Sequence, residues 1–439
     1  MVLTDRQRAE LHAGIHEYLL SQQGDLFARA AEAMAMADPQ SCQQKASGDA
    51  APKASSVPII EKKWTAVPRL QKKVLELERA LSQSARSNLN GGVVSGMPIK
   101  DRRMIPRPPC VHTLQSHNGV VTCVAVHPVF TMAVSGGEDA TIKVWDHESG
   151  EYVRTLRGHT QGVNSVCFTP KTGSHICSSS SDLSIKLWDF ATHVCIRTLK
   201  GHDHTISDAL FIPNLQGSAI KGGGENDFTD CSQLVSASRD YTIKFWDLET
   251  GFCVHTSKDH TDWVRCLATK ADGSLLASSG SDQAIVVRKT DGDRKKICEL
   301  RGHEHVVESL AFMTMAAGAQ SSNMGATQQK RILEMADYLV SGSRDRSVRM
   351  WNAMSGELLK VFKFHENWVR SVILHPSGNF IFSAGDDRSI RVIDLKSDRN
   401  LRTIDNAHPH FVSSIAMHPT LPILVSGSID HSVKCWLLD

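Results

Sequence analysis

A set of four residue types recurs seven times between residues 117 and 436 and strongly constrains the fold of this 439-residue chain. Each copy has a histidine, then a serine, an aspartate four residues later, and a tryptophan or its substitute six residues after that. The most regular copy is His159, Ser178, Asp182 and Trp188. Its relatives begin at His117, His202, His260, His303, His365 and His408. A period of about 40 to 45 residues with Gly-His and Trp-Asp marks is typical of a four-stranded propeller blade.

The repeat therefore predicts an all-β, seven-bladed propeller over residues 110–439. Each copy contains four strand-like stretches, and the residue four positions after the histidine is always Val or Ile, which indicates a core position. Residues 111–115 precede the first histidine, whereas the last copy ends at Trp436 without a fourth strand. We expect these two stretches to pair, which closes the ring and removes an open sheet edge.

Two of the intervals between repeat histidines are longer than the rest, at 58 and 62 residues. The extra residues lie at 216–230 and 316–329 and are rich in Gly, Ser, Ala and Gln. Such composition predicts mobile loops without a core of their own, within the segments 214–231 and 314–335. Both are expected on the face opposite the His and Asp turns, and no function is assigned to them.

Residues 4–37 have the pattern of a small helical dimerisation motif. Thr4 and Gln7 fit a helix capping box, and helical spacing then separates four apolar side chains, Leu11, Ile15, Tyr18 and Leu19. A segment this short does not bury a core by itself, so we expect it to pair with a second copy of the chain. The alternative is an amphipathic hairpin that docks on its own propeller. Residues 38–59 are predicted to be a flexible linker.

Residues 60–86 show the spacing of a short coiled coil. Its apolar seam includes Leu70, Val74, Leu77 and Leu81, and charged residues lie outside the seam. Pro68 removes a backbone donor, so the helix is expected to start or kink there. A dimerised N-terminus would raise the local concentration of the two short helices. Residues 87–109, rich in Gly and Pro, form a second linker.

The composition argues against several other classes of function. A net charge of +2 gives no basis for binding nucleic acid, and no apolar run is long enough for membrane insertion. The 11 cysteines include no Cys-x-x-Cys pair, which favours a reduced, intracellular protein and argues against a metal site. No cofactor is predicted.

Serine, histidine and aspartate recur in every blade, which argues against catalysis. A catalytic triad is needed once, whereas a structural network is needed in each blade. We therefore expect a protein that is not an enzyme, in which Trp188, Ser178, His159 and Asp182 tie neighbouring strands together. Blades four and six have Arg288 and Ile393 in place of tryptophan. Their networks are predicted to be incomplete and the two blades less rigid.

Departures from the repeat point to one rim of the ring. Blades four and six both carry Trp-Val-Arg after the histidine, and strand alternation places Trp and Arg on the side opposite the buried valine. Arginines also precede the turn aspartates of blades three and five, and histidines follow some repeat histidines by two residues. Such side chains dominate binding hot spots, and the predicted set is Arg239, Trp263, Arg265, His305, Arg344, Trp368, Arg370 and His410. The alternative is that the tryptophans fill gaps between blades while the arginines are solvated.

Short segments along nearly the whole chain match one known family. They include EKKWT at 61–65, RLQKKV at 69–74, IPRPP at 105–109, GHDH at 201–204 and NWVR at 367–370. With the N-terminal motif and the propeller, they resemble the lissencephaly-type dynein regulators of the nuclear-distribution F family. In animals this family also supplies the non-catalytic subunit of platelet-activating-factor acetylhydrolase. The helical motif at 4–37 is then a lissencephaly-homology motif.

The resemblance implies a homodimer that binds the motor domain of the cytoplasmic dynein heavy chain. It also implies a coiled-coil adaptor of the nuclear-distribution E type, an indirect link to microtubules, and acetylhydrolase catalytic subunits as further candidate partners. The implied roles are minus-end-directed transport, nuclear migration and spindle positioning, in the cytoplasm and at the cytoskeleton, centrosome, spindle and microtubule plus ends. The motor-contacting residues implied are Arg239, Arg265, Arg344, Trp368, Arg370 and His410.

Two other functions remain compatible with the sequence. One is a substrate adaptor or co-repressor scaffold, because other propellers also follow a lissencephaly-homology motif. The other is the regulatory subunit of a lipid acetylhydrolase. Nuclear residence without dynein would favour the first, and co-purification with a separate serine esterase would favour the second.

Overall fold

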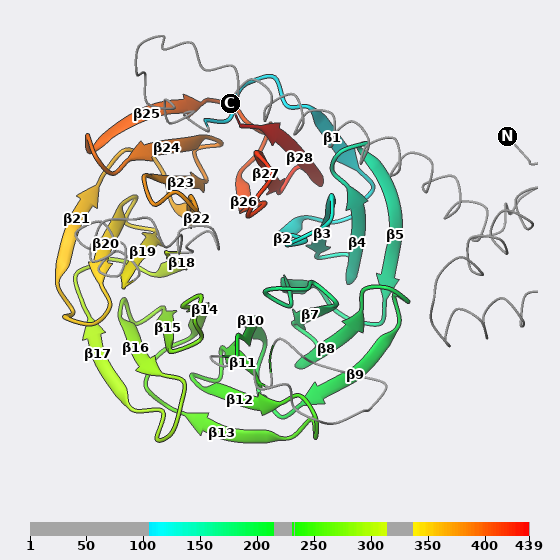
Figure 1. Cartoon of the computed structure of the whole chain (residues 1–439), viewed down its shortest axis with the longest axis vertical. Helices are drawn as coiled ribbons and strands as arrows, with labels where there is room; N and C mark the ends of the chain where they lie inside the picture. The colour runs from blue at the N-terminus through cyan, green and yellow to red at the C-terminus, as the bar shows by residue number, and fades with distance from the viewer. Residues whose placement is uncertain (1–104, 215–230, 232, 314–336, 439) are drawn as a thin grey trace, which may run out of the picture. The chain divides into compact units, whose positions relative to one another are not determined.

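The computed structural model describes residues 105–214, 231, 233–313 and 337–438. These residues form a ring of seven four-stranded antiparallel sheets, the blades, arranged around a central axis (Figure 1). The predicted helical motif at 4–37, the linker at 38–59 and the coiled coil at 60–86 lie outside the described residues. So do residues 87–104 of the second predicted linker, 87–109, and most of the two predicted loops.

In blades one to six, each blade uses four consecutive strands, with the first strand nearest the axis and the fourth on the outside (Figure 1). Blades one to three consist of β2 (Val121–Val126), β3 (Met132–Gly137), β4 (Thr141–Asp146), β5 (Glu151–Arg157), β6 (Val163–Phe168), β7 (His175–Ser180), β8 (Ser184–Asp189), β9 (Cys195–Lys200), β10 (Ile206–Ile212), β11 (Gln233–Ser238), β12 (Ile243–Asp247) and β13 (Cys253–Ser257).

Blades four to six follow the same order, and blade seven takes its outer strand from the start of the ring. Their strands are β14 (Val264–Thr269), β15 (Leu275–Gly280), β16 (Ile285–Lys289), β17 (Lys296–Leu300), β18 (Val307–Phe312), β19 (Tyr338–Ser343), β20 (Val348–Asn352), β21 (Leu358–Phe362), β22 (Val369–Leu374), β23 (Phe380–Gly385), β24 (Ile390–Asp394), β25 (Arg399–Ile404), β26 (Val412–Met417), β27 (Ile423–Ser428), β28 (Ser432–Leu437) and β1 (His112–Gln115).

The ring closes by pairing β1 with β28, as the sequence predicted. The register sets His112 opposite Cys435 and Gln115 opposite Ser432, and an isolated bridge joins Pro106 to Leu438. Leu114 is 3% exposed and packs with residues of blades one and seven. Closure thus covers the last edge of blade seven with chain from the other end of the ring.

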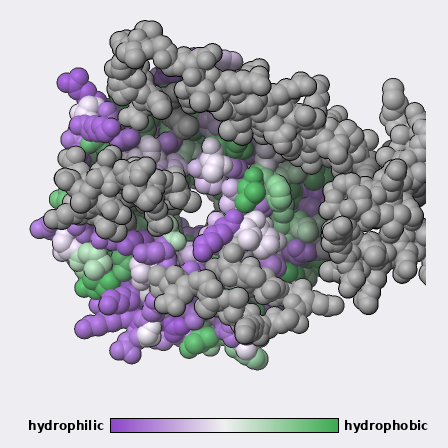
Figure 2. Space-filling model, in the orientation of Figure 1, coloured by the Kyte–Doolittle hydropathy of each residue, from purple (hydrophilic) through white to green (hydrophobic). Residues whose placement is uncertain are grey.

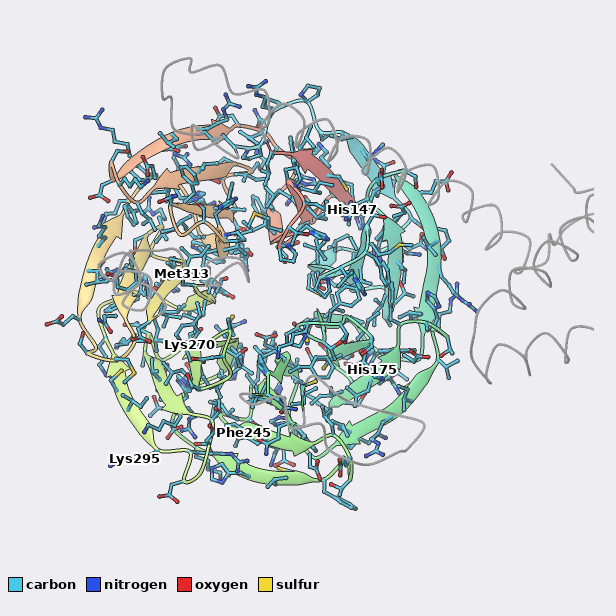
Figure 3. All side chains as sticks on the ribbon, in the orientation of Figure 1. His147, His175, Phe245, Lys270, Lys295 and Met313 are labelled. Atoms are coloured by element: carbon cyan, nitrogen blue, oxygen red, sulfur yellow. The ribbon has the colours of Figure 1, made fainter. Side chains whose placement is uncertain are left out.

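Apolar side chains fill the boundaries between blades. The residue four positions after each repeat histidine is at most 1% exposed, as predicted: Val121, Val163, Ile206, Val264, Val307, Val369 and Val412. Figure 3 shows side chains packed throughout the sheets, and Figure 2 shows an opening at the centre of the ring. None of the described residues forms a helix long and apolar enough to cross a membrane.

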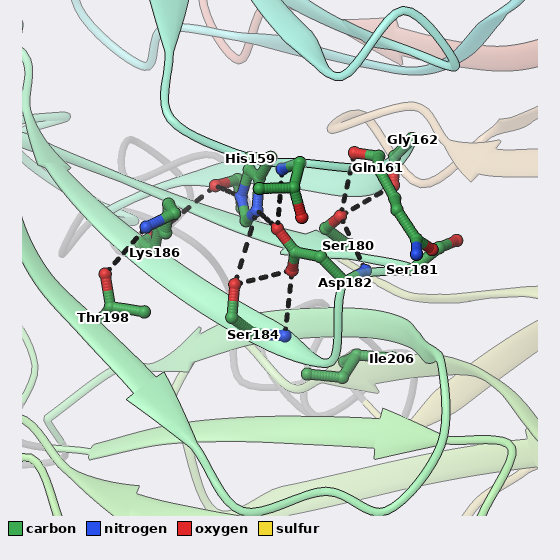
Figure 4. Close-up of polar contacts among 12 residues, drawn as sticks. His159, Gln161, Gly162, Ser180, Ser181, Asp182, Ser184, Lys186, Thr198 and Ile206 are labelled. Carbon is green, nitrogen blue, oxygen red and sulfur yellow. Dashed lines mark hydrogen bonds and ion pairs between the residues drawn. The ribbon is translucent and has the colours of Figure 1, made fainter.

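The repeated polar residues form one hydrogen-bond network per blade, and Figure 4 shows contacts of the network in blade two. In blade two, His159 Nδ1 lies 2.8 Å from Asp182 Oδ2 and Nε2 lies 2.8 Å from Ser178 Oγ, while Trp188 Nε1 donates to Ser178 Oγ at 2.9 Å. Burial raises the pKa of Asp182, but bonds from Ser184, His159 and Thr160 outweigh it and lower this pKa to about 2. The carboxylate therefore stays charged and anchors the turn.

The networks of blades four and six lack the tryptophan link but keep the contacts of histidine with serine and aspartate. His260 still contacts Ser278 at 2.8 Å and Asp282 at 2.9 Å. The equivalent distances from His365 to Ser383 and Asp387 are both 2.7 Å. The networks of these two blades are therefore incomplete, as predicted, because the tryptophan hydrogen bond is missing. The lower rigidity of these blades stays a prediction.

Candidate functional site

Two short stretches of each blade build the rim on which the sequence placed a binding surface. One is the start of the first strand, and the other is the turn between the second and third strands. The first strand has a β-bulge in every blade, and in blades four and six the ladder skips Arg265 and Arg370. A bulge residue leaves the ladder and its side chain is re-aimed. The bulge, rather than simple strand alternation, therefore sets the direction of these two arginines.

The first rim cluster crosses the boundary between blades three and four. Trp263 is half-buried, and the guanidinium carbon of Arg239 lies 4.8 Å from the centroid of its ring. The guanidinium carbon of Arg265 lies 5.1 Å from the same centroid. Arg239 comes from the turn of blade three, whereas Trp263 and Arg265 come from blade four. Both contacts have the geometry of a cation–π interaction.

The second rim cluster repeats this arrangement between blades five and six. Arg344, from the turn of blade five, lies 4.4 Å from the ring centroid of Trp368, and Arg370 of blade six lies 5.1 Å from it. Residues that are 24 to 26 positions apart in the sequence thus form one surface. We call these groups the Trp263 cluster (Arg239, Trp263 and Arg265) and the Trp368 cluster (Arg344, Trp368 and Arg370).

Acidic side chains neutralise the Trp368 cluster. Arg344 Nε donates to Glu308 Oε1 at 2.5 Å, and Arg370 donates to both carboxylate oxygens of Asp386, at 2.8 and 3.0 Å. Burial alone would lower the pKa of Arg370, but its bonds to Asp386 and the nearby charge of Glu308 raise it. Arg344 and Arg370 keep only 18% and 28% of their side-chain surface exposed. Both arginines cover the tryptophan. The alternative interpretation had instead expected them to extend into solvent.

The two predicted histidines differ in their place on the rim. His305 is exposed and its ring centroid lies 6.3 Å from that of Trp368, so it joins the Trp368 cluster. His410 packs edge-on against Phe411, with ring centroids 4.4 Å apart. It lines a hollow of about 420 Å³ between blades six and seven, together with Glu366, Asn367, Asp386, Asp387, Arg388, Pro409 and Phe411.

Two acidic rim residues escaped the sequence prediction. Asp386 precedes the turn aspartate of blade six, the position that Arg239 and Arg344 occupy in blades three and five. Glu308 occupies the position of Arg265 and Arg370 in blade five. A comparison of charge at matched positions would have found both residues.

The remaining predicted site residues either lie outside the described residues or belong to the hydrogen-bond networks within the blades. Leu11, Ile15, Tyr18, Leu19, Leu70, Val74, Leu77 and Leu81, predicted to form the dimer contact, lie outside the described residues. Among the residues that are described, no group of three or more His, Cys, Asp or Glu side chains is arranged to hold a metal ion. What the rim presents is two half-buried tryptophans, each in contact with two arginines.

Comparison with known proteins agrees with the seven blades. The family described as WD domain, G-beta repeat matches residues 108–146, 150–189, 193–247, 251–288, 333–352, 356–394 and 399–436. A nuclear distribution protein PAC1 of Coccidioides posadasii is 38% identical, over 96% of this chain and 87% of the relative. A nuclear distribution protein nudF of Emericella nidulans is 39% identical, over 82% and 79%. A PAC1 protein of Gibberella zeae is 38% identical, over 95% and 89%.

Proposed function

The chain belongs to the PAC1 and nudF family of nuclear distribution proteins, which carry WD repeats, and from this premise we propose that it regulates nuclear migration by binding the cytoplasmic dynein motor domain. The proposed binding surface is the rim that carries the Trp263 and Trp368 clusters. The protein acts as a scaffold and performs no chemical reaction itself.

The observation that supports this proposal is the doubled Arg-Trp-Arg arrangement on one face of the ring. Tryptophan and arginine are the residue types most enriched in binding hot spots. Here each tryptophan is held by two arginines from neighbouring blades, so the side chains are ordered before a partner arrives. Pre-ordering reduces the entropy that binding costs. A rim of this kind can bind a large, folded partner.

We further propose that the protein acts as a homodimer and works with a coiled-coil adaptor of the nuclear-distribution E type. Two rims linked through paired N-termini would bind two sites on a motor with an avidity that exceeds the affinity of either ring alone. The expected sites of action are the cytoplasm and the cytoskeleton, including the centrosome, the spindle and microtubule plus ends.

The test is binding of the purified full-length protein to a dynein motor domain. The variants are Trp368→Ala and the double substitution Arg344→Ala with Arg370→Ala. Loss of a hot-spot side chain costs about 2 kcal/mol or more, so we expect binding to weaken about 30-fold. Phe252→Ala is a matched control, because Phe252 is a 74% exposed aromatic residue next to the outer strand β13.

The possible outcomes separate the partner from the site. Weaker binding by the rim variants, with an unchanged circular dichroism spectrum and unchanged binding by Phe252→Ala, supports both assignments. Full binding by both rim variants keeps dynein as the partner and removes the Trp368 cluster as its site. Failure of the unmodified protein to bind removes the dynein assignment.

A further inference from the structure

The rim follows a pairing rule that relates two positions in four of the seven blades. There, the residue five positions after the repeat histidine lies beside the residue that precedes the turn aspartate of the same blade. Hydrogen bonds join the two positions in four blades: Asn164 to Ser181 at 3.2 Å, Arg265 to Ser281 at 3.2 Å, Arg344 to Glu308 at 2.5 Å, and Arg370 to Asp386 at 2.8 Å. The charges of these two side chains therefore determine whether the rim of that blade is electrically neutral at this point.

Blades five and six are neutral by this rule, because each pairs one arginine with one acid. Blade four pairs Arg265 with Ser281, which carries no charge. Blade three places Ser207 and Arg239 at the two positions, and neither Ser207 Oγ nor Arg239 Nε has a hydrogen-bond partner among the described residues. No carboxylate of the described chain forms an ion pair with Arg239 or Arg265. Both guanidinium groups nevertheless meet at Trp263.

The electrostatic surroundings of Arg265 and Arg370 differ in the same direction. Burial lowers the pKa of Arg265, and the charges of Arg344, Arg239 and Arg370 lower it further, with only Glu308 opposing them. Arg370, which has its own carboxylate in Asp386, has a raised pKa. A partially buried guanidinium without a carboxylate gains more from an incoming anion than one that is already paired. The Trp263 cluster is thus the part of the rim whose positive charge is not neutralised by an ion pair and can bind an anion.

We propose that the Trp263 cluster receives carboxylate side chains from an acidic segment of the protein partner, whereas the Trp368 cluster makes a charge-compensated contact. The inference rests on the proposed use of the rim for partner binding. A planar carboxylate matches the fork of donors on a guanidinium. Glu308, the acid whose charge acts on Arg265, is already paired with Arg344 and leaves the Trp263 cluster without an ion-pair partner of its own.

The test uses the full-length protein labelled with 5-fluorotryptophan and fluorine NMR, with no motor protein present. The spectra of Trp263→Phe and Trp368→Phe assign the two rim tryptophans. The probe is a capped hexaglutamate peptide, and a capped hexaserine peptide is its neutral counterpart. We expect the Trp263 resonance to shift and saturate with hexaglutamate alone, and the Trp368 resonance to stay in place. Raising the salt from about 50 to 300 mM should weaken this binding several-fold.

Substitution locates the charge. Arg239→Gln with Arg265→Gln should weaken hexaglutamate binding at least about tenfold, since two charge-assisted contacts are lost. The matched control, Arg157→Gln with Arg399→Gln, removes the same charge from exposed positions on the outer strands β5 and β25 and should bind like the unmodified protein. If the Arg239→Gln, Arg265→Gln double variant does not fold, the salt dependence of binding and the identity of the resonance that shifts still test the proposal.

Three results would overturn the proposal. They are no shift at Trp263, an equal shift at Trp368, or binding of a capped phosphoserine peptide in place of hexaglutamate. Because the probe is a peptide, these results do not depend on whether dynein is the partner. If the protein does not bind the dynein motor domain but hexaglutamate shifts the Trp263 resonance, dynein is rejected as the partner and the site for an acidic segment is retained.

Discussion

Arg288 forms an ion pair with Asp259 in blade four, at the place where Trp246 rests against Gly201 in blade three. A Cβ atom on Gly201 would lie 3.1 Å from Trp246 Cη2, so the tryptophan depends on a small residue before the repeat histidine. Blade four replaces both members of this pair. Its Gly-His becomes Asp259-His260 and its tryptophan becomes Arg288, which is 3% exposed.

Removing one member of the pair should therefore cost more than exchanging both. Arg288→Met leaves the Asp259 carboxylate without its ion-pair partner, with the Ser257 hydroxyl still donating to it, and we expect unfolding to become about 3 kcal/mol easier. The double substitution Asp259→Gly with Arg288→Trp should recover most of this loss, since the indole can then donate to Ser278. Urea unfolding followed by circular dichroism measures both. Equal losses in the single and double variants would contradict the idea of a compensated exchange.

The serine of each network should matter in proportion to the groups it satisfies. Ser178→Ala leaves both Trp188 Nε1 and His159 Nε2 without a partner, at a cost of about 2 to 4 kcal/mol. Ser278→Ala in blade four deprives only His260 of its partner and should cost about half as much. The two urea midpoints give the comparison. A larger loss for Ser278→Ala would refute this account of the network.

Buried histidines at the edge of blade one predict a loss of stability in acid. Burial lowers the pKa of His127 and His147 to about 4, and neither nitrogen of His147 has a partner among the described residues. Because the unfolded chain takes up these protons near pH 6.5, stability is complete above that pH and falls as the pH drops from 6.5 towards 4. Each histidine contributes up to about 1.4 kcal/mol per pH unit.

His147→Phe should make this acid-induced loss shallower, because it removes one of the titrating groups from the blade one to blade seven boundary. Its ring lies 5.9 Å from that of His418, whose charge would also oppose protonation. Urea midpoints at pH 7.5, 6.5, 5.5 and 4.5 give the slope for each protein. Parallel slopes for the variant and the unmodified chain would show that His147 does not contribute.

The pairing of β1 with β28 should control how easily the ring opens. Leu114→Asp places a charge at a position that is 3% exposed between blades one and seven, and we expect a loss of about 3 kcal/mol or more. The ring should then open first at this boundary and become sensitive to proteases there. Thr113→Asp, on the exposed side of the same strand, is the control. Cleavage that begins in another blade would argue against β1 as the closing element.

Much of the fold could be read from the chain because the repeat is local. Each blade carries its own histidine, serine and aspartate, and the spacing after the aspartate never varies, so the number of blades follows from counting. The missing fourth strand after Trp436 and the spare strand before His117 predicted the closure of the ring. The alternating pattern around Val121 and its six equivalents identified core positions, since a buried face must be apolar along its whole length.

The rim was predicted only in part. Its tryptophans and arginines stand out as departures from the repeat, but the contacts between them cross from one blade to the next. Glu308 and Asp386, which neutralise the Trp368 cluster, drew no attention because a single charged residue on a strand or turn is normally solvated. The β-bulge at Arg265 and Arg370 was also missed, since it depends on how the first strand meets its neighbour.

The sequence by itself determined the blade number, the closing strand pair and the buried valines, because these depend on spacing and burial within each repeat. Only the tertiary structure decided that Arg239 and Arg265 share Trp263 without a carboxylate, while Arg344 and Arg370 share Trp368 with two. The physical reason is that electrostatic compensation depends on distances of a few ångströms between side chains from different blades. Those distances follow from the packing of the ring, which the order of residues does not state.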